Sequence, residues 1–258
     1  MATTTTAVDS RNAAGSLYVY GLTWAGRGSA CGRGIGDARV ELLEHGELAA
    51  IVSSVGGSAL RAKRRDLLRH SDVLQHAFAQ APVLPLRFGT VLGSSDAVVD
   101  DLLAARYEEL VSLLQQFEGT SELRLRATFV EQAVLAEIVR DDKHVARLRD
   151  VTRTASDADP RRIQLGEAVA GALTARRAAA ADEIVQSLAK HALDLRSEEP
   201  RDALEVVRAS FLVGERKVRE LERAAEALAA RHKRRITFDL VGPMPPHSFV
   251  ALTPPGSR

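Results

Sequence analysis

A glycine-rich segment, Gly26–Gly36, is the first place in this chain to look for chemistry. Five glycines lie within it, together with Arg27 and Arg33. A phosphate-binding loop leads from a strand into the N-terminus of a helix, where backbone N–H groups bind the anion. The residues that follow, Ala38–Leu43, favour a strand instead, and no Gly-Lys-Ser or Gly-Lys-Thr string is present. The pattern therefore predicts a loop between two strands, with nucleotide binding kept as an alternative.

Isolated cysteine and histidine side chains are the other candidate catalytic or metal-binding groups. Cys31 has arginines but no histidine near it in the sequence to lower the pKa of its thiol. His70 and His76 are six residues apart on an expected helix, whereas histidines that share a metal on one helix are usually four apart. The sequence has no Gly-x-Ser-x-Gly nucleophile elbow. We therefore expect no catalytic residue, no cofactor and no metal site.

Charge balance and cysteine content narrow the class of protein. Thirty-five basic residues against 34 acidic ones leave a net charge of +1, whereas a general nucleic-acid binder or a polybasic membrane anchor needs a clear positive excess. A single cysteine forms no intrachain disulfide and is typical of a reducing compartment. No apolar run approaches the roughly 20 residues of a membrane span, and the Thr-rich start lacks the apolar core of a signal peptide. We expect a cytoplasmic protein whose residues 1–15 are disordered.

Hydrophobic periodicity and turn residues predict alternating strands and helices. In the first half, the expected strands are 17–22, 40–43, 48–52 and an extended stretch at 82–92, and the expected helices are 60–79 and 96–117. In the second half, the expected strands are 122–129, 203–213 and 234–241, and the expected helices are 131–140, 162–195 and 215–232. The charged segment 141–160 is expected to be a mobile connection or a frayed helix.

These elements predict an α+β fold with two domains, because each half mixes strands with helices that cover one face of a sheet. We expect an N-terminal α+β domain at 16–119 and a C-terminal ferredoxin-like α+β domain at 120–242, with the long helix 162–195 as an insertion. A proline-rich arm at 243–258 follows. Pro243, Pro245 and Pro246 fix φ and donate no backbone hydrogen bond, so the arm is expected to be rigid and extended.

Several strings, taken together and in order, resemble the gas vesicle protein L/F family. They are Leu17–Gly21, the string His70-x-Asp72-Val73-Leu74, Val83–Val91, Ile163–Glu167, Phe211–Val213 and Val241–Val250, and they span roughly residues 17–252. Two positions depart from the family pattern. Met244 stands where the family usually has Trp, and His247 stands where it has Tyr. Since buried aromatic side chains dominate contact energies, the resemblance implies a weaker contact of the arm in this chain.

The resemblance implies a non-enzymatic accessory protein of gas vesicle formation. Such a protein is expected to bind the hydrophobic shell subunit, to help nucleate assembly, and to contact other gas vesicle accessory proteins. It would bind neither nucleic acid nor a lipid membrane, and it would lie in the cytoplasm with the vesicle. The family fold is a two-domain α+β fold whose C-terminal part is ferredoxin-like.

Two segments are the expected partner-binding residues. They comprise Arg87, Phe88, Gly89, Gly242, Pro243, Met244, Pro245, Pro246, His247 and Phe249. An equal alternative is that the first segment only shapes a strand bend and the second only fixes the C-terminus across the two domains. Two other functions remain open: a nucleotide-binding or enzymatic module that uses Gly26–Gly36, and a generic scaffold whose Ala-rich helix drives self-association.

Overall fold

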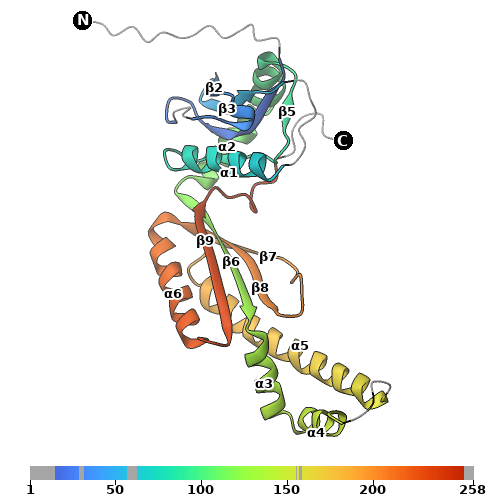
Figure 1. Ribbon diagram of the computed structural model, residues 1–258. Coiled ribbons are helices and arrows are strands. Elements are labelled where there is room, and N and C mark those ends of the chain that lie inside the picture. The colour runs from blue at the N-terminus through green and yellow to red at the C-terminus, as the bar shows by residue number, and fades with distance from the viewer. Residues whose placement is uncertain (1–14, 29–31, 57–62, 155, 157–158, 253–258) are drawn as a thin grey trace, which may run out of the picture. The chain divides into compact units, whose positions relative to one another are not determined.

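The computed structural model describes residues 15–28, 32–56, 63–154, 156 and 159–252 (Figure 1). Contacts divide the chain into two compact units: residues 1–120 with 244–258, and residues 121–243. The first unit therefore contains both the N-terminal half and the C-terminal segment of the chain. The segment predicted to be disordered, residues 1–15, lies outside the described residues apart from Gly15.

The first unit combines a five-stranded sheet with helices. Its elements are β1 (Leu17–Trp24), η1 (Ile35–Asp37), β2 (Val40–His45), β3 (Leu48–Ser54), α1 (Arg64–Phe78), β4 (Leu84–Pro85), β5 (Val91–Leu92), η2 (Ala97–Ala104) and α2 (Tyr107–Phe117). The strand order is β2-β3-β1-β4, with β5 also paired to β1. Every pair is antiparallel.

Strand β1 is the centre of the first unit. All eight of its residues are buried, which requires cover on both faces of the sheet. Tyr18 pairs with Ser53, but the register with β3 shifts between Val19 and Gly21, so Tyr20 occupies a bulge. The core beside α1 therefore contains two tyrosines among aliphatic side chains. Its buried members are Tyr18, Tyr20, Ile35, Val40, Ile51, Val73, Leu74 and Val83.

In its described residues, the second unit contains four strands, four α-helices and the short η3. Its elements are β6 (Thr120–Phe129), α3 (Glu131–Asp141), α4 (Lys143–Thr152), α5 (Pro160–Ala189), β7 (Asp194–Ser197), β8 (Glu205–Gly214), η3 (Glu215–Lys217), α6 (Val218–Arg231) and β9 (Ile236–Met244). The strand order is β7-β8-β6-β9. In Figure 1, α4 and the first half of α5 extend beyond this sheet, while α6 packs beside it. The mixture of helices and antiparallel sheets confirms the predicted α+β class.

The two faces of β6 differ in polarity because polar and apolar residues alternate along the strand. Leu123, Leu125 and Ala127 join the helix-covered core. On the other face, Arg126 donates to the fully buried carboxylate of Glu205 at 2.8 Å. Arg208 donates to the same carboxylate, and so does the backbone N–H of Arg201. Burial raises the pKa of Glu205, but these three donors outweigh it and hold the pKa below its usual range.

Three predicted helical segments were wrong in their extent. The expected helix 96–117 is two elements, η2 and α2, separated at Ala105 and Arg106. The segment 141–160, expected to be a mobile connection or a frayed helix, contains helix α4 at Lys143–Thr152. This helix begins where the Asp142 side chain accepts from two backbone N–H groups of the first turn. The expected helix 162–195 begins at Pro160 and ends at Ala189, and Asp194–Ser197 form β7 instead. Among the described helices, none is both long and apolar enough to cross a membrane.

Candidate functional site

The turn Arg87–Thr90 is the first of the two segments expected to bind a partner. The Thr90 N–H and hydroxyl both donate to the Arg87 carbonyl, at 3.2 and 2.8 Å. Gly89 has φ +93°, a conformation that side chains disfavour, so this position requires glycine. Its N–H donates to the Tyr18 hydroxyl at 3.0 Å, which fixes the turn to β1.

The same Tyr18 hydroxyl joins the turn to α1 through His70. Tyr18 Oη lies 2.8 Å from His70 Nδ1. The Leu86 backbone also acts on the His70 ring and raises its pKa, an effect smaller than that of burial. Burial, together with the charge on His247, lowers the pKa of His70 to about 4. His70 is therefore neutral near pH 7.

Aromatic rings surround this hydrogen-bonded chain. The Phe88 ring centroid lies 6.0 Å from that of Tyr18 and 5.7 Å from that of His70. Tyr20 stacks on His70 at 5.7 Å, its hydroxyl lies 2.9 Å from Ser53 Oγ, and it accepts from the Ile35 N–H. Burial raises the pKa of both tyrosines. Tyr18, Tyr20 and His70 therefore do not exchange a proton near neutrality, and their hydrogen bonds hold the turn.

The C-terminal arm also reaches this cluster. Residues 244–252 belong to the first unit, and Pro245, Pro246 and Leu252 are buried. His247 is half-buried and close enough to His70 for its charge to lower the pKa of that ring. The prediction of an extended arm was wrong at Pro246–Phe249, where the Phe249 N–H donates to the Pro246 carbonyl at 3.1 Å and closes a turn.

The structure brings together some of the expected partner-binding residues and separates others. Phe88 and His247 gather around His70 in the first unit, whereas Gly242 and Pro243 belong to the second. Gly242 has φ +141°, and a Cβ there would lie 2.7 Å from the Glu122 carbonyl, so only glycine fits. Arg87 and Gly89 are exposed, while Met244, Phe249 and Phe88 are half-buried.

The glycine-rich segment has no phosphate-loop geometry in its described part. Residues 29–31 lie outside the described residues, and Cys31 with them. From Gly32 onward the segment passes through the three-residue η1 into β2, so no long helix begins there to bind an anion. Among the described residues, no group of three or more His, Cys, Asp or Glu side chains is arranged to hold a metal ion.

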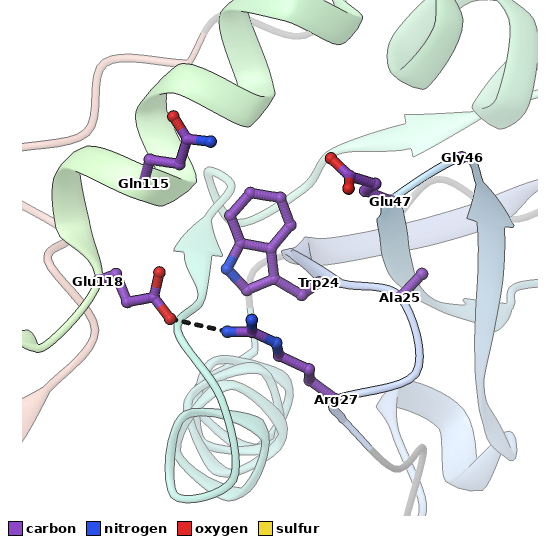
Figure 2. Close-up of a pocket in the computed structure, with 7 residues that line it drawn as sticks. All are labelled: Trp24, Ala25, Arg27, Gly46, Glu47, Gln115 and Glu118. Carbon is purple, nitrogen blue, oxygen red and sulfur yellow. Dashed lines mark hydrogen bonds and ion pairs between the residues drawn. The ribbon is translucent and has the colours of Figure 1, made fainter.

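An open depression in the first unit was not foreseen from the sequence. Its volume is about 400 Å³, and Trp24, Arg27, Glu47, Gln115 and Glu118 line it (Figure 2). Arg27 pairs with Glu118 at 2.7 Å. The one signal in the sequence was the position of the only tryptophan, two residues after the predicted strand 17–22 and three residues before an arginine.

Comparison with known proteins decides the family. A profile of the family described as Gas vesicle synthesis protein GvpL/GvpF matches residues 16–251. This chain belongs to that family. Gas vesicle protein F of a Streptomyces species is 35% identical over 245 residues, which cover 91% of this chain and 99% of the relative. Gas vesicle protein F of Dolichospermum flosaquae is 24% identical over 194 residues, covering 74% of this chain and 79% of the relative.

Solved structures share the GvpL/GvpF family fold of this chain. The crystal structure of gas vesicle protein GvpF from an Anabaena species superposes with a TM-score of 0.78 at 20% identity, covering 93% of this chain and 99% of the other. The crystal structure of GvpF from Microcystis aeruginosa superposes with a TM-score of 0.73 at 20% identity, covering 92% of this chain and 99% of the other. Membership of this family gives the chain a role in gas vesicle formation.

Proposed function

We propose that this chain is a minor, non-enzymatic accessory protein that binds the hydrophobic shell subunit of the gas vesicle and helps nucleate its assembly. The family match over residues 16–251 carries this proposal. A shell subunit with exposed apolar surface aggregates unless another protein covers it, and this accessory protein would supply that cover. Other gas vesicle accessory proteins are the further partners we propose, and the cytoplasm, at the vesicle, is the proposed location.

The second unit we interpret as a ferredoxin-like domain at 120–242. Its strand order β7-β8-β6-β9 and the element order strand, helices, strand, strand, helix, strand support this interpretation. Helices α3 to α5 occupy the first crossover, where a simple ferredoxin-like domain has one helix. The first unit then corresponds to the N-terminal domain at 16–119, and residues 243–258 form the arm.

We propose the exposed part of the Arg87–Gly89 turn, with the arm beside it, as the surface that contacts the partner. Arg87 is exposed and Phe88 is half-buried, on a turn that Tyr18 and Thr90 hold in one conformation. A fixed turn loses little conformational entropy on binding, and arginine and aromatic residues are enriched among those that dominate binding energies. Met244, His247 and Phe249 would extend this surface along the arm.

Counting vesicles in cells tests the proposed function. In a host that forms gas vesicles, deletion of this chain should reduce vesicle number, and the wild-type chain should restore it. Arg87→Ala should restore it only in part, because it removes an exposed contact without disturbing the turn. Arg39→Ala, which changes another exposed arginine of the first unit, is the matched control and should restore it fully. Unchanged vesicle numbers on deletion would refute the proposal.

A further inference from the structure

The indole of Trp24 has a buried N–H with no acceptor among the described residues. Trp24 is 7% exposed and lies at the end of β1, where it lines the depression. Buried indole N–H groups usually find a hydrogen-bond partner, and an unpaired one is costly. The unpaired donor therefore suggests that an acceptor from another molecule completes the site.

The Arg27–Glu118 ion pair lies beside this donor. Figure 2 shows the nitrogen edge of the Trp24 ring turned toward the side of the depression where the two charged side chains meet. The guanidinium carbon lies 5.9 Å from the centre of the Trp24 ring. The side chains of Arg27 and Glu118 are 60% and 47% exposed, and ion pairs this exposed stabilise a protein little. An incoming ligand can displace the pair at small cost.

The charges and amides of the depression define the ligand. Two carboxylates, Glu47 and Glu118, face one guanidinium, Arg27, which leaves a net charge of −1 and disfavours an anion. Among the described residues, the Glu47 carboxylate forms no ion pair. Gln115 is exposed, and its amide can donate and accept at once, as a peptide group requires. A ligand complementary to these groups presents a backbone carbonyl to the Trp24 donor and carries a cation nearby.

We propose that this depression binds an extended segment of a partner protein that carries a lysine or arginine. A carbonyl of the segment accepts from Trp24 Nε1, Gln115 pairs with its backbone, and the cation pairs with Glu47. That the partner is another gas vesicle protein rests on the proposed function, whereas the peptide chemistry does not. Glu47 is the residue that selects a basic segment over an acidic one.

The single tryptophan makes the site observable, because fluorescence excited at the indole band reports on Trp24 alone. The full chain is titrated with an acetylated, amidated hexapeptide of alternating alanine and lysine. Its alanine–glutamate counterpart and spermidine, which carries the same charge as the lysine peptide, are the comparison ligands. The lysine peptide should shift the Trp24 emission saturably, and the other two should not.

Variants locate the contact. Glu47→Gln should weaken binding of the lysine peptide about tenfold. Glu41 is an exposed residue of β2 outside the depression, so Glu41→Gln should leave this binding unchanged. No saturable shift, an equal shift with the glutamate peptide or spermidine, or equal affinities of the two variants would overturn the proposal. Vesicle counts after deletion of the chain test the proposed function separately, so failure of one does not imply failure of the other.

Discussion

The two units of this chain bury their polar groups in opposite ways. In the first, Tyr18, His70 and Gly89 form a chain of neutral hydrogen bonds that holds a surface turn. In the second, the buried carboxylate of Glu205 is neutralised by Arg126 and Arg208. A neutral network costs less to desolvate but loses stability as the pH falls from about 6.5 to about 4, because His70 is then protonated more readily in the unfolded chain. A buried ion pair is costly to break at any pH above the pKa of its carboxyl. The units should therefore fail under different conditions.

The largest effect should follow removal of the buried carboxylate. Glu205→Ala leaves Arg126 and Arg208 without their shared partner, and breaking a buried ion pair in this way costs about 3 kcal/mol. Urea unfolding followed by far-UV circular dichroism measures the loss, while the emission of Trp24 follows the first unit separately. Asp150→Ala breaks the exposed pair with Arg149 and should cost at most about 1 kcal/mol. If the two variants lost equal free energy of unfolding, burial of the Glu205 carboxylate would not be what makes its ion pairs costly to break.

Acidification should act on the first unit through His70. Its pKa is about 4 in the folded chain and about 6.5 when unfolded, so the unfolded state binds more protons between these values. Stability is therefore complete above pH 6.5 and falls as the pH is lowered to about 4, by about 3 kcal/mol. The urea midpoint of the Trp24 transition at pH 7 and pH 4.5 measures the loss. His70→Gln should reduce this pH dependence, and an unchanged slope would show that other groups cause it.

Removal of one hydroxyl should have a smaller effect on the same network. Tyr18→Phe leaves the Gly89 N–H and His70 Nδ1 without their partner, which costs about 2 kcal/mol. Tyr107→Phe removes an exposed acceptor of the Glu47 N–H and should cost at most about 1 kcal/mol. Thermal unfolding of the two variants side by side tests the difference. If both lost the same stability, the Tyr18 hydroxyl would not be what holds the turn.

The smallest effect concerns the arm at His247, where the resemblance of the sequence to the gas vesicle protein L/F family implies a tyrosine. The charge of His247 is one cause of the low pKa of His70, so His247→Tyr should raise that pKa above about 4 toward its ordinary value. Titration of the His70 ring protons by NMR measures the change. His144→Tyr, on an exposed part of α4, should leave the His70 titration where it was. A shift of equal size in both variants would exclude a direct effect of the arm.

The sequence predicted those elements whose own residues show a clear periodic pattern of apolar and polar side chains. Alternation along 122–129 predicted β6, and the α+β class followed from such segments. Strand β7 has only one half-buried residue, Leu195, in four, so it shows no alternation. Its extended conformation comes from pairing with β8, a tertiary effect that the preceding Ala-rich helix concealed.

The candidate site was predictable in part. The resemblance singled out Arg87–Gly89, and the prolines singled out the arm, but the sequence predicted an extended stretch where the turn Arg87–Thr90 lies and did not predict the network beneath it. Tyr18 and His70 are 52 positions apart, and no local pattern joins them. The prolines predicted a rigid, extended arm, whereas the structure has a turn at Pro246–Phe249. The place of the arm in the first unit depends on a fold that its own residues do not specify.

Direct binding of the shell subunit tests the central claim. The purified chain, immobilised on beads, should retain the purified shell subunit above the background of bare beads. Arg87→Ala should lower the affinity about tenfold, and Arg39→Ala should leave it unchanged. Retention no greater than that of bare beads would contradict the account.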